Sequence, residues 1–252
     1  MRNILAILLL ASTCVNAQFY QIDYEVQPQI AFTPKAIEAM KQYYPDTKQR
    51  DEVIEMTKNI PSIDYIFTYN SSQSQSTINL KLNNSQQPGG MRMGIGPDIG
   101  EHPVFNYKEQ LYYNQSDFQG KKIMVYDSLN KVDFKDTGKS KTILGIETKE
   151  AIGKHKDVDV IAWYAPSLPY VYSPDKYFGT KGLILELHYK YIKDDIEVMI
   201  SWNPKAKKEL KKEPVYKLNE SLKKVSYPEL ISMYDEMNKR IIEAENQGVD
   251  KK

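Results

Sequence analysis

The chain has 252 residues, with 34 lysines and arginines against 33 aspartates and glutamates, so its formal net charge is +1. A chain this close to neutrality offers no basic surface for nucleic acid, and we expect no nucleic-acid partner. It has nineteen tyrosines. Because tyrosine prefers half-buried sheet positions, this composition indicates a β-rich fold.

Residues 1–17 have the pattern of a signal peptide. Arg2 supplies a positive charge, residues 4–11 form an apolar run, and residues 15–17 fit a signal-peptidase site. The apolar run is too short to cross a bilayer and no later stretch approaches that length, so we predict an exported protein without a transmembrane span. A second interpretation places the cleavage before Cys14, which would then carry a lipid.

Cleavage after residue 17 also removes the single cysteine. The mature chain, residues 18–252, would then contain no disulfide, no reactive thiol and no metal site built on cysteine. We divide it into an antiparallel β-rich domain at residues 18–204 and a Lys-rich connector with a C-terminal helix at residues 205–252.

Apolar and polar residues alternate along most of the chain, which is the pattern of strands with one buried face. The predicted strands cover residues 20–27, 63–69, 78–82, 104–107, 111–113, 122–126, 131–135, 141–149, 158–164, 183–191 and 196–202. Residues 70–75 and 193–195 are the predicted turns of two hairpins. Strands that follow one another without intervening helices predict an antiparallel meander.

A broken helix is predicted between the first two strands. Thr33 can cap a helix that begins at Pro34, and Pro45 ends it. Asp46 then offers a second cap, with Gln49 three residues later, so a second helix extends to about residue 57.

The C-terminal segment predicts a connector followed by an amphipathic helix. Residues 205–224 hold eight lysines against three glutamates, which indicates either a solvated connector or a contact site for an anionic lipid or glycan. Ser226 and Glu229 form a capping box. Apolar residues follow at helical spacing, so we expect this helix to pack on the sheet. They are Leu230, Tyr234, Met237 and Ile241.

Residues 163–189 gather aromatic residues, prolines and glycines ahead of an alternating strand. The prolines keep the loop out of a strand ladder, while Gly179 and Gly182 permit unusual backbone angles or a close approach of another segment. Two uses are open for the aromatic residues: a plug that completes the core, or a lip that binds a ligand. They are Trp163, Tyr164, Tyr170, Tyr172, Tyr177 and Phe178.

A family resemblance rests on the same stretch. The end of one strand at residues 162–164 leads through a proline-containing loop to Gly179, Gly182, Leu183 and Ile184. Residues 141–190 thereby resemble the GLPGLI family, exported proteins of Gram-negative bacteria without a settled activity, although Thr and Lys at positions 180 and 181 replace the family's Leu-Pro pair. The resemblance implies a location in the periplasm, at the outer-membrane periphery or outside the cell.

Catalytic motifs are weak. Residues 173–176 match Ser-x-x-Lys but lack the partner motifs of that chemistry, and the glycine-rich residues 89–100 do not form a phosphate loop. Asp98, Glu101 and His102 are the candidate metal ligands, and their spacing fits no closed metal site. We therefore predict no enzyme, no metal and no cofactor.

A solvent-facing cross-strand pair is the expected role of His188, which lies beside Glu186 and Lys190 on the polar face of its strand.

These patterns predict an α+β fold, mostly β: a long curved antiparallel sheet, with a broken helix after the first strand and a C-terminal amphipathic helix. Such a half-barrel resembles periplasmic lipoprotein carriers, which suggests a non-enzymatic envelope protein that binds a lipid or another apolar ligand. The alternative is an accessory protein that docks on an outer-membrane partner through residues 205–224 or the last helix. A hydrolase with paired carboxylates is third.

Overall fold

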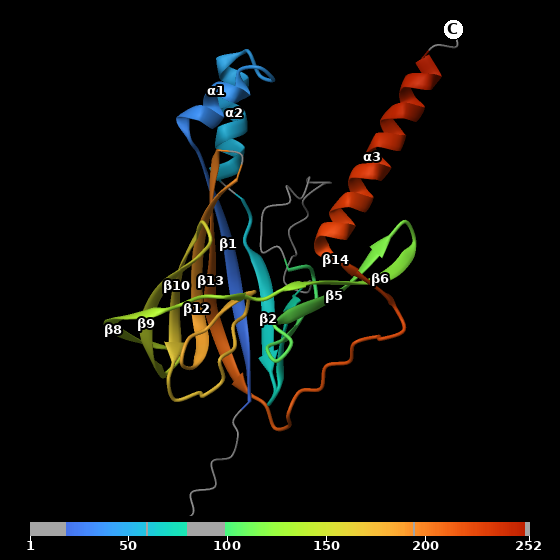
Figure 1. Cartoon of the computed structure of the whole chain (residues 1–252). Helices are drawn as coiled ribbons and strands as arrows, with labels where there is room; N and C mark the ends of the chain where they lie inside the picture. Colours follow the sequence, from blue (N-terminus) through green and yellow to red (C-terminus); the bar gives the residue numbers. More distant parts are fainter. Residues whose placement is uncertain (1–18, 59, 80–98, 194, 250–252) are drawn as a thin grey trace, which may run out of the picture.

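The computed structural model describes residues 19–58, 60–79, 99–193 and 195–249 (Figure 1). The predicted signal peptide, the candidate ligand Asp98 and the predicted strand residues 80–82 lie outside the described residues. Of the described helices, none has the length and apolarity needed to cross a membrane.

Twelve strands form one open sheet in the order β14-β6-β5-β4-β3-β2-β1-β13-β12-β10-β9-β8. They are β1 (Tyr20–Phe32), β2 (Ile63–Tyr69), β3 (Gln73–Ile78), β4 (Val104–Asn106), β5 (Leu111–Phe118), β6 (Lys121–Ser128), β8 (Lys135–Ile143), β9 (Ile146–His155), β10 (Val158–Ala165), β12 (Leu183–Lys193), β13 (Ile196–Glu209) and β14 (Lys223–Ser226). Apart from the parallel pair β14 and β6, neighbouring strands are antiparallel. A second, two-stranded sheet pairs β7 (Asn130–Lys131) with β11 (Tyr177–Phe178). The predicted fold class is confirmed.

The centre of the sheet is the pair β1 and β13. Their register runs from Tyr20 opposite Glu209 to Phe32 opposite Ile196. Every second residue of β1 from Tyr20 to Pro28 is buried, so the predicted alternation is correct. The strand β13 continues through the first lysines of the predicted connector and ends at Glu209.

In the hairpin of β2 and β3, the strand β3 has a polar inner face that the sequence analysis missed. The second strand begins at Gln73, inside the predicted turn. Ser74 and Ser76 are fully buried, although Ser74 falls in the predicted turn and Ser76 precedes the predicted strand. Their hydroxyls are satisfied by the hydroxyl of Tyr107 at 2.9 Å and by the carbonyl oxygen of Pro174, which accepts a hydrogen bond at 2.6 Å.

The predicted strand at residues 141–149 was wrong, because it crosses a turn. The chain reverses at Leu144 and Gly145, which have φ angles of 49° and 78°, and the hairpin of β8 and β9 results. Two consecutive residues with positive φ form the tight turn that suits a twisted hairpin. An apolar leucine at such a position gives no turn signal.

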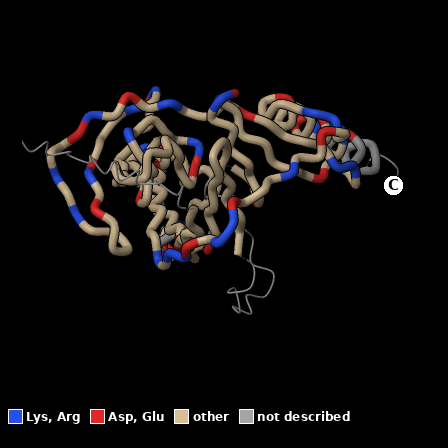
Figure 2. Tube along the Cα trace, turned by 90° about the horizontal axis from the view of Figure 1, so that it is seen from below, with Lys and Arg blue, Asp and Glu red and all other residues tan. Residues whose placement is uncertain are grey.

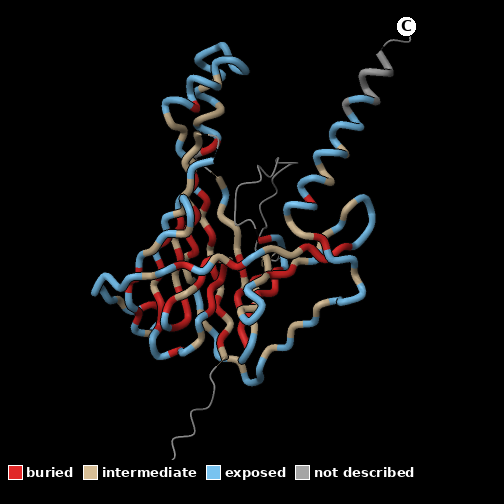
Figure 3. Tube along the Cα trace, in the orientation of Figure 1, coloured by how far each residue is buried: buried red, intermediate tan, exposed pale blue. Residues whose placement is uncertain are grey.

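The two N-terminal helices begin where the capping residues predict. The Thr33 hydroxyl accepts a hydrogen bond from the Ala36 backbone at the start of α1 (Pro34–Met40), and Asp46 accepts one from the Gln49 backbone in α2 (Thr47–Lys58). Both helices extend beyond one end of the sheet (Figure 1). We call residues 34–58 the helical tip. Most of its surface is exposed (Figure 3).

The C-terminal segment crosses from β13 to the far edge of the sheet. Residues 210–222 form an extended strap, held by hydrogen bonds from Asn70 to the Pro214 carbonyl and from Tyr216 to Thr68. The strap leads into β14 and then α3 (Tyr227–Val249). The predicted capping box is present.

Only the beginning of α3 packs on the sheet. Leu230 joins a small cluster with Ile123, Val125 and Val225 of β6 and β14. The rest of α3 projects away from the sheet (Figure 1), so the predicted packing holds for the first turns alone.

Candidate functional site

The loop from residue 166 to residue 182, between β10 and β12, is the stretch in which the sequence analysis placed a candidate ligand site. We call it the crossover loop. Its backbone bonds to strands on both sides: Ile184 donates to the Tyr172 carbonyl at 2.9 Å, and Val132 donates to the Phe178 carbonyl at 2.8 Å. The Ser76 hydroxyl donates to the Pro174 carbonyl. The loop thus spans the inner face of the sheet from β12 to β3.

The aromatic residues of the crossover loop fill this inner face. Tyr172 stacks on Tyr107 with ring centroids 4.3 Å apart, and Tyr170 lies 5.0 Å from Tyr69 of β2. Tyr177 lies 4.7 Å from Tyr189 of β12. Offset and edge-on ring pairs of this kind stabilise a core beyond the area that they bury. Burial raises the pKa of Tyr172 to about 12, so its hydroxyl stays neutral at physiological pH.

A buried carboxyl group anchors the crossover loop. Asp175 is fully buried. One of its oxygens accepts hydrogen bonds from the Trp202 indole at 2.8 Å and the Tyr189 hydroxyl at 3.0 Å, and the other accepts the Lys176 backbone N–H at 2.5 Å. Burial raises the pKa of Asp175 above its usual value despite these donors. The group links the loop to β12 and β13 at the centre of the sheet.

Gly179 and Gly182, the two glycines of the loop, lie where it touches other backbone. Gly179 has a φ angle of 131°, and a Cβ there would lie 2.4 Å from the Val132 carbonyl oxygen. A Cβ on Gly182 would lie 2.2 Å from the Ala165 carbonyl oxygen. Neither position has room for a side chain, so the two glycines allow the close approach that the sequence indicated. Leu183 and Ile184, the next motif residues, are fully buried.

The six candidate ligand residues are therefore not all in one place. Tyr164, Tyr172, Tyr177 and Phe178 are buried in the main core, and Tyr170 and Trp163 are partly buried against it, Trp163 from another face of the sheet. Among the described residues, no buried side-chain nitrogen or oxygen lacks a hydrogen-bond partner. Two hollows in the described structure, of about 450 and 120 Å³, are lined by other segments and by none of these six residues.

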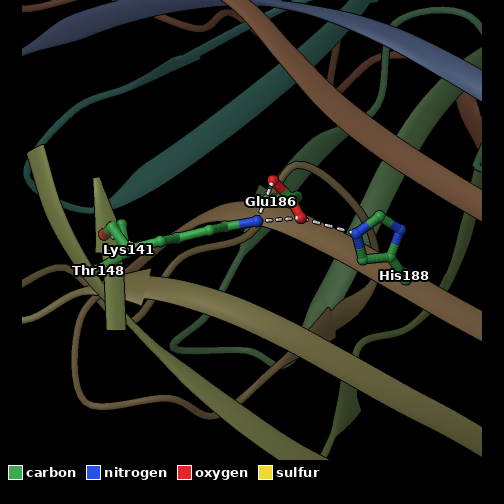
Figure 4. A network of polar contacts seen from close by, with 4 residues as sticks. All are labelled: Lys141, Thr148, Glu186 and His188. Atoms are coloured by element: carbon green, nitrogen blue, oxygen red, sulfur yellow. Dashed lines mark hydrogen bonds and ion pairs between the residues drawn. The ribbon is translucent and has the colours of Figure 1, made fainter. Parts of the chain in front are cut away.

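Trp163, the sixth residue, lies in a polar cluster on the outer face of the sheet. It pairs in register with Glu186 of β12, and directly opposed residues of neighbouring strands share a face. The Lys141 amino group lies over the Trp163 ring at 4.1 Å from its centroid. Its nitrogen donates to both oxygens of Glu186 at 2.7 and 2.8 Å, and a His188 ring nitrogen lies 2.8 Å from one of them (Figure 4).

Both carboxylates beside Trp163 are held ionised. Burial alone would raise the pKa of Glu186, but the hydrogen bonds from His188 and Lys141 outweigh it and leave the pKa below the usual value. Glu150, which pairs with Trp163 from β9, has its pKa lowered by hydrogen bonds from Lys139 and Thr137. A general acid needs a pKa raised toward neutrality, and neither group has one.

The Glu186 cluster predicts a pH dependence of stability. Because its pKa is lowered in the folded state, Glu186 contributes stability that is present above its unfolded pKa and is lost as the pH falls through its folded pKa. We expect Glu186→Gln to lower the free energy of unfolding by about 1–2 kcal/mol at pH 7, since hydrogen bonds to a charged group are lost. The difference from the wild type should shrink below about pH 4.

Urea unfolding of residues 18–252 from pH 3 to pH 8 measures this difference. Glu197→Gln is the matched control, because Glu197 forms a more exposed ion pair with Lys190. If Glu186→Gln lowers the free energy of unfolding equally at all pH values, the charge of the Glu186 carboxylate is not the cause of the lost stability.

The candidate metal ligands do not form a site in the described part of the chain. Glu101 and His102 are exposed, and the His102 backbone donates to Asn114 at 3.1 Å. No group of three His, Cys, Asp or Glu side chains suited to a metal ion occurs among the described residues. The cross-strand pair predicted for His188 is not present: His188 pairs with Glu186 of its own strand, in a partly buried contact. Lys190 pairs with Glu197 across to β13.

The surface offers apolar side chains rather than a field of one charge. Lysine, arginine and acidic residues are interspersed along the trace (Figure 2). In the helical tip, Tyr43 is 76% exposed and Met56 is 72% exposed. Ile37 and Tyr44 are further exposed apolar residues there. The sequence analysis did not single out Tyr43 and Met56, because helical spacing predicted only which positions face inward.

A family model described as "Protein of unknown function (Porph_ging)" matches residues 114–186. This range runs from β5 through the crossover loop to the Glu186 cluster, and it includes most of the segment that resembles the GLPGLI family. It supports a family of unknown function and does not confirm the GLPGLI name. No curated protein matches the sequence.

Solved structures of PNGF-II are similar to the chain. The structure in the P21 space group has 16% sequence identity and a TM-score of 0.48, and covers 86% of this chain and 33% of that chain. The structure in the C2 space group has 17% identity and a TM-score of 0.45, with 83% and 31% covered. The chain thus spans about a third of the length of these proteins.

Proposed function

We propose that the protein is a non-enzymatic interaction protein, exported to the cell envelope, that docks on another envelope protein through its helical tip. The proposal rests on one contrast: the inner face of the sheet is filled, whereas the helical tip carries exposed apolar side chains. The crossover loop occupies the face where a half-barrel carrier would hold an acyl chain, whereas Tyr43 and Met56 are exposed for more than two thirds of their surface. Tyrosine and methionine are enriched in protein interfaces.

A protein partner fits the tip better than a membrane surface. Residues 34–58 contain five basic and five acidic side chains, so the tip has no net positive charge to attract anionic lipids. Several charges already pair within or near it, as Lys35 does with Asp195 at 2.8 Å. A neutral, mixed-charge rim around apolar side chains is typical of protein interfaces.

Native mass spectrometry tests this function. The protein is purified without detergent from the envelope fraction of its own host. We expect the mass of the chain plus that of a second, different protein subunit. The double variant Tyr43→Ser, Met56→Ser should lose this subunit, because its contact residues are gone. The control variant Val215→Ser should keep it, since Val215 is 77% exposed but lies in the strap.

The other functions predict other outcomes. A bound mass in the lipid range that disappears when Tyr172 is replaced would favour the carrier over the interaction protein. A subunit that remains bound to the double variant would contradict docking through the helical tip.

A further inference from the structure

Thr33 is the residue at which the helical tip joins the sheet. It follows Phe32, the last residue of β1, which lies opposite Ile196 in the register of β1 with β13. The first residue of α1 comes directly after Thr33. A single residue therefore separates the central strand from the first helix, and its conformation sets the direction in which the tip leaves the sheet.

The Thr33 side chain bonds to the sheet and to the tip at once. Its hydroxyl donates to the carbonyl oxygen of Asp195, in the turn before β13, at 2.7 Å, and accepts the Ala36 backbone N–H at 3.2 Å. The Thr33 backbone N–H donates to the same Asp195 carbonyl at 3.3 Å. Because a hydroxyl donates one hydrogen bond and can still accept others, one side chain both ties the tip to the sheet and caps α1.

The other contact across this junction is an ion pair between Lys35 and the Asp195 carboxylate at 2.8 Å. Its side chains are 80% and 39% exposed, and exposed ion pairs contribute little. The hydrogen bonds of Thr33 are therefore the main ties on this side of the tip, and the bond from the hydroxyl is the shorter of the two.

The helical tip is held at its base rather than along its length. Among the tip residues whose burial the structure describes, Ala36 and Thr57 are buried, in the first turn of α1 and the last turn of α2. Where the chain returns to the sheet, the Gln27 side-chain amide donates to the Ile60 carbonyl at 3.0 Å. The angle between tip and sheet thus depends on a few bonds at the junction.

We propose that Thr33 is a positioning residue for docking: its hydroxyl holds the helical tip at one angle to the sheet, so that Tyr43 and Met56 meet a partner in a fixed orientation. The docking part of this inference rests on the function proposed above. A tip that changes its angle would offer the binding orientation for only part of the time. The apparent dissociation constant would then rise by the inverse of that fraction.

Three substitutions of Thr33 separate the tie from the cap. Thr33→Ser keeps both, and Thr33→Val loses both. Thr33→Asp keeps the cap, because aspartate is a good N-cap residue, but an ionised carboxylate cannot donate to the Asp195 carbonyl. Thr47→Val is the matched control, because the Thr47 hydroxyl accepts a hydrogen bond from Arg50 at 2.9 Å within the tip.

Pulsed EPR distances between a spin label on the tip and one on the sheet measure the angle. The labels are attached to Gln42→Cys and Lys149→Cys, two exposed positions, in residues 18–252, which contain no other cysteine. We expect a narrow distance distribution for the parent protein, Thr33→Ser and Thr47→Val, and a broad one for Thr33→Val and Thr33→Asp. A broad distribution in the parent protein, or one in Thr33→Asp that is as narrow as in the parent, would overturn the proposal.

Native mass spectrometry of the protein from its envelope fraction connects the angle to docking. We expect Thr33→Asp to bind the second subunit about fivefold more weakly than the wild type, and Thr33→Ser to bind it equally well. Equal binding by Thr33→Asp would contradict a positioning role in docking. If the wild type carries no second subunit, docking through the tip is wrong, whereas the distance distributions still decide whether Thr33 fixes the tip.

Discussion

Gly179→Ala is expected to lower the free energy of unfolding by about 3 kcal/mol. Two costs add. The φ angle of 131° is one that residues with a Cβ rarely adopt. The new Cβ would also lie 2.4 Å from the Val132 carbonyl oxygen. That oxygen belongs to a backbone fixed by the hydrogen bond from Val132 to Phe178, so it cannot move away cheaply.

Gly120→Ala separates the two costs. Gly120 also has a positive φ, 76°, but a Cβ there would meet nothing within 4 Å. We expect a loss of only about 1 kcal/mol from the backbone angle. Urea unfolding of both variants in residues 18–252 measures the difference. Equal losses would show that the contact between the crossover loop and Val132 is looser than the structure indicates.

Asp175→Ala is expected to lower the free energy of unfolding by about 3–5 kcal/mol. The substitution removes the acceptor of two buried donors, the Trp202 indole and the Tyr189 hydroxyl, and of the partly buried Lys176 backbone N–H. Each unsatisfied buried donor costs on the order of 1–3 kcal/mol, partly recovered if water enters. Asp175→Asn keeps one acceptor oxygen, and we expect it to lose less.

The pH dependence gives an independent readout for Asp175. Burial raises its pKa in the folded state, so the folded chain holds the proton more tightly than the unfolded chain does. This group therefore contributes stability at low pH that is lost as the pH rises through its folded pKa, the opposite of Glu186. Asp175→Asn should remove that loss. If the stability of the wild type relative to Asp175→Asn does not fall as the pH rises, the carboxyl group is not desolvated as described.

The sequence predicted the elements whose apolar residues alternate or whose caps are explicit. Tyr20 to Val26 in β1, the cap at Thr33 and the capping box of Ser226 are examples. Prediction from the sequence failed where the hydrogen-bond partner of a polar side chain lies far along the chain. Ser74 was assigned to a turn and Ser76 to no strand, because the hydroxyl of Tyr107 and the carbonyl of Pro174 that satisfy them cannot be inferred from their neighbours.

The candidate site was predictable in composition but not in arrangement. The aromatic residues, Gly179 and Gly182 predicted a loop with unusual backbone angles. A plug that completes the core was one of the two roles expected for its aromatic residues. Asp175 appeared only as part of a weak Ser-x-x-Lys match, because its donors Tyr189 and Trp202 lie on other strands. The exposure of Tyr43 and Met56 depends on where the tip stands relative to the sheet, which periodicity does not specify.

The pairing of β1 with β13 has a consequence for how the protein folds. Tyr20 lies opposite Glu209, so the two strands at the middle of the sheet come from nearly opposite ends of the described chain. Contacts of such long sequence separation require a large loop to close before they return any stability, and folding slows accordingly. While the chain is being made, β1 lacks this partner until β13, which ends at Glu209, is available. Until then β1 is an open strand edge that can pair with other chains, and the protein depends on staying unfolded or protected during this interval.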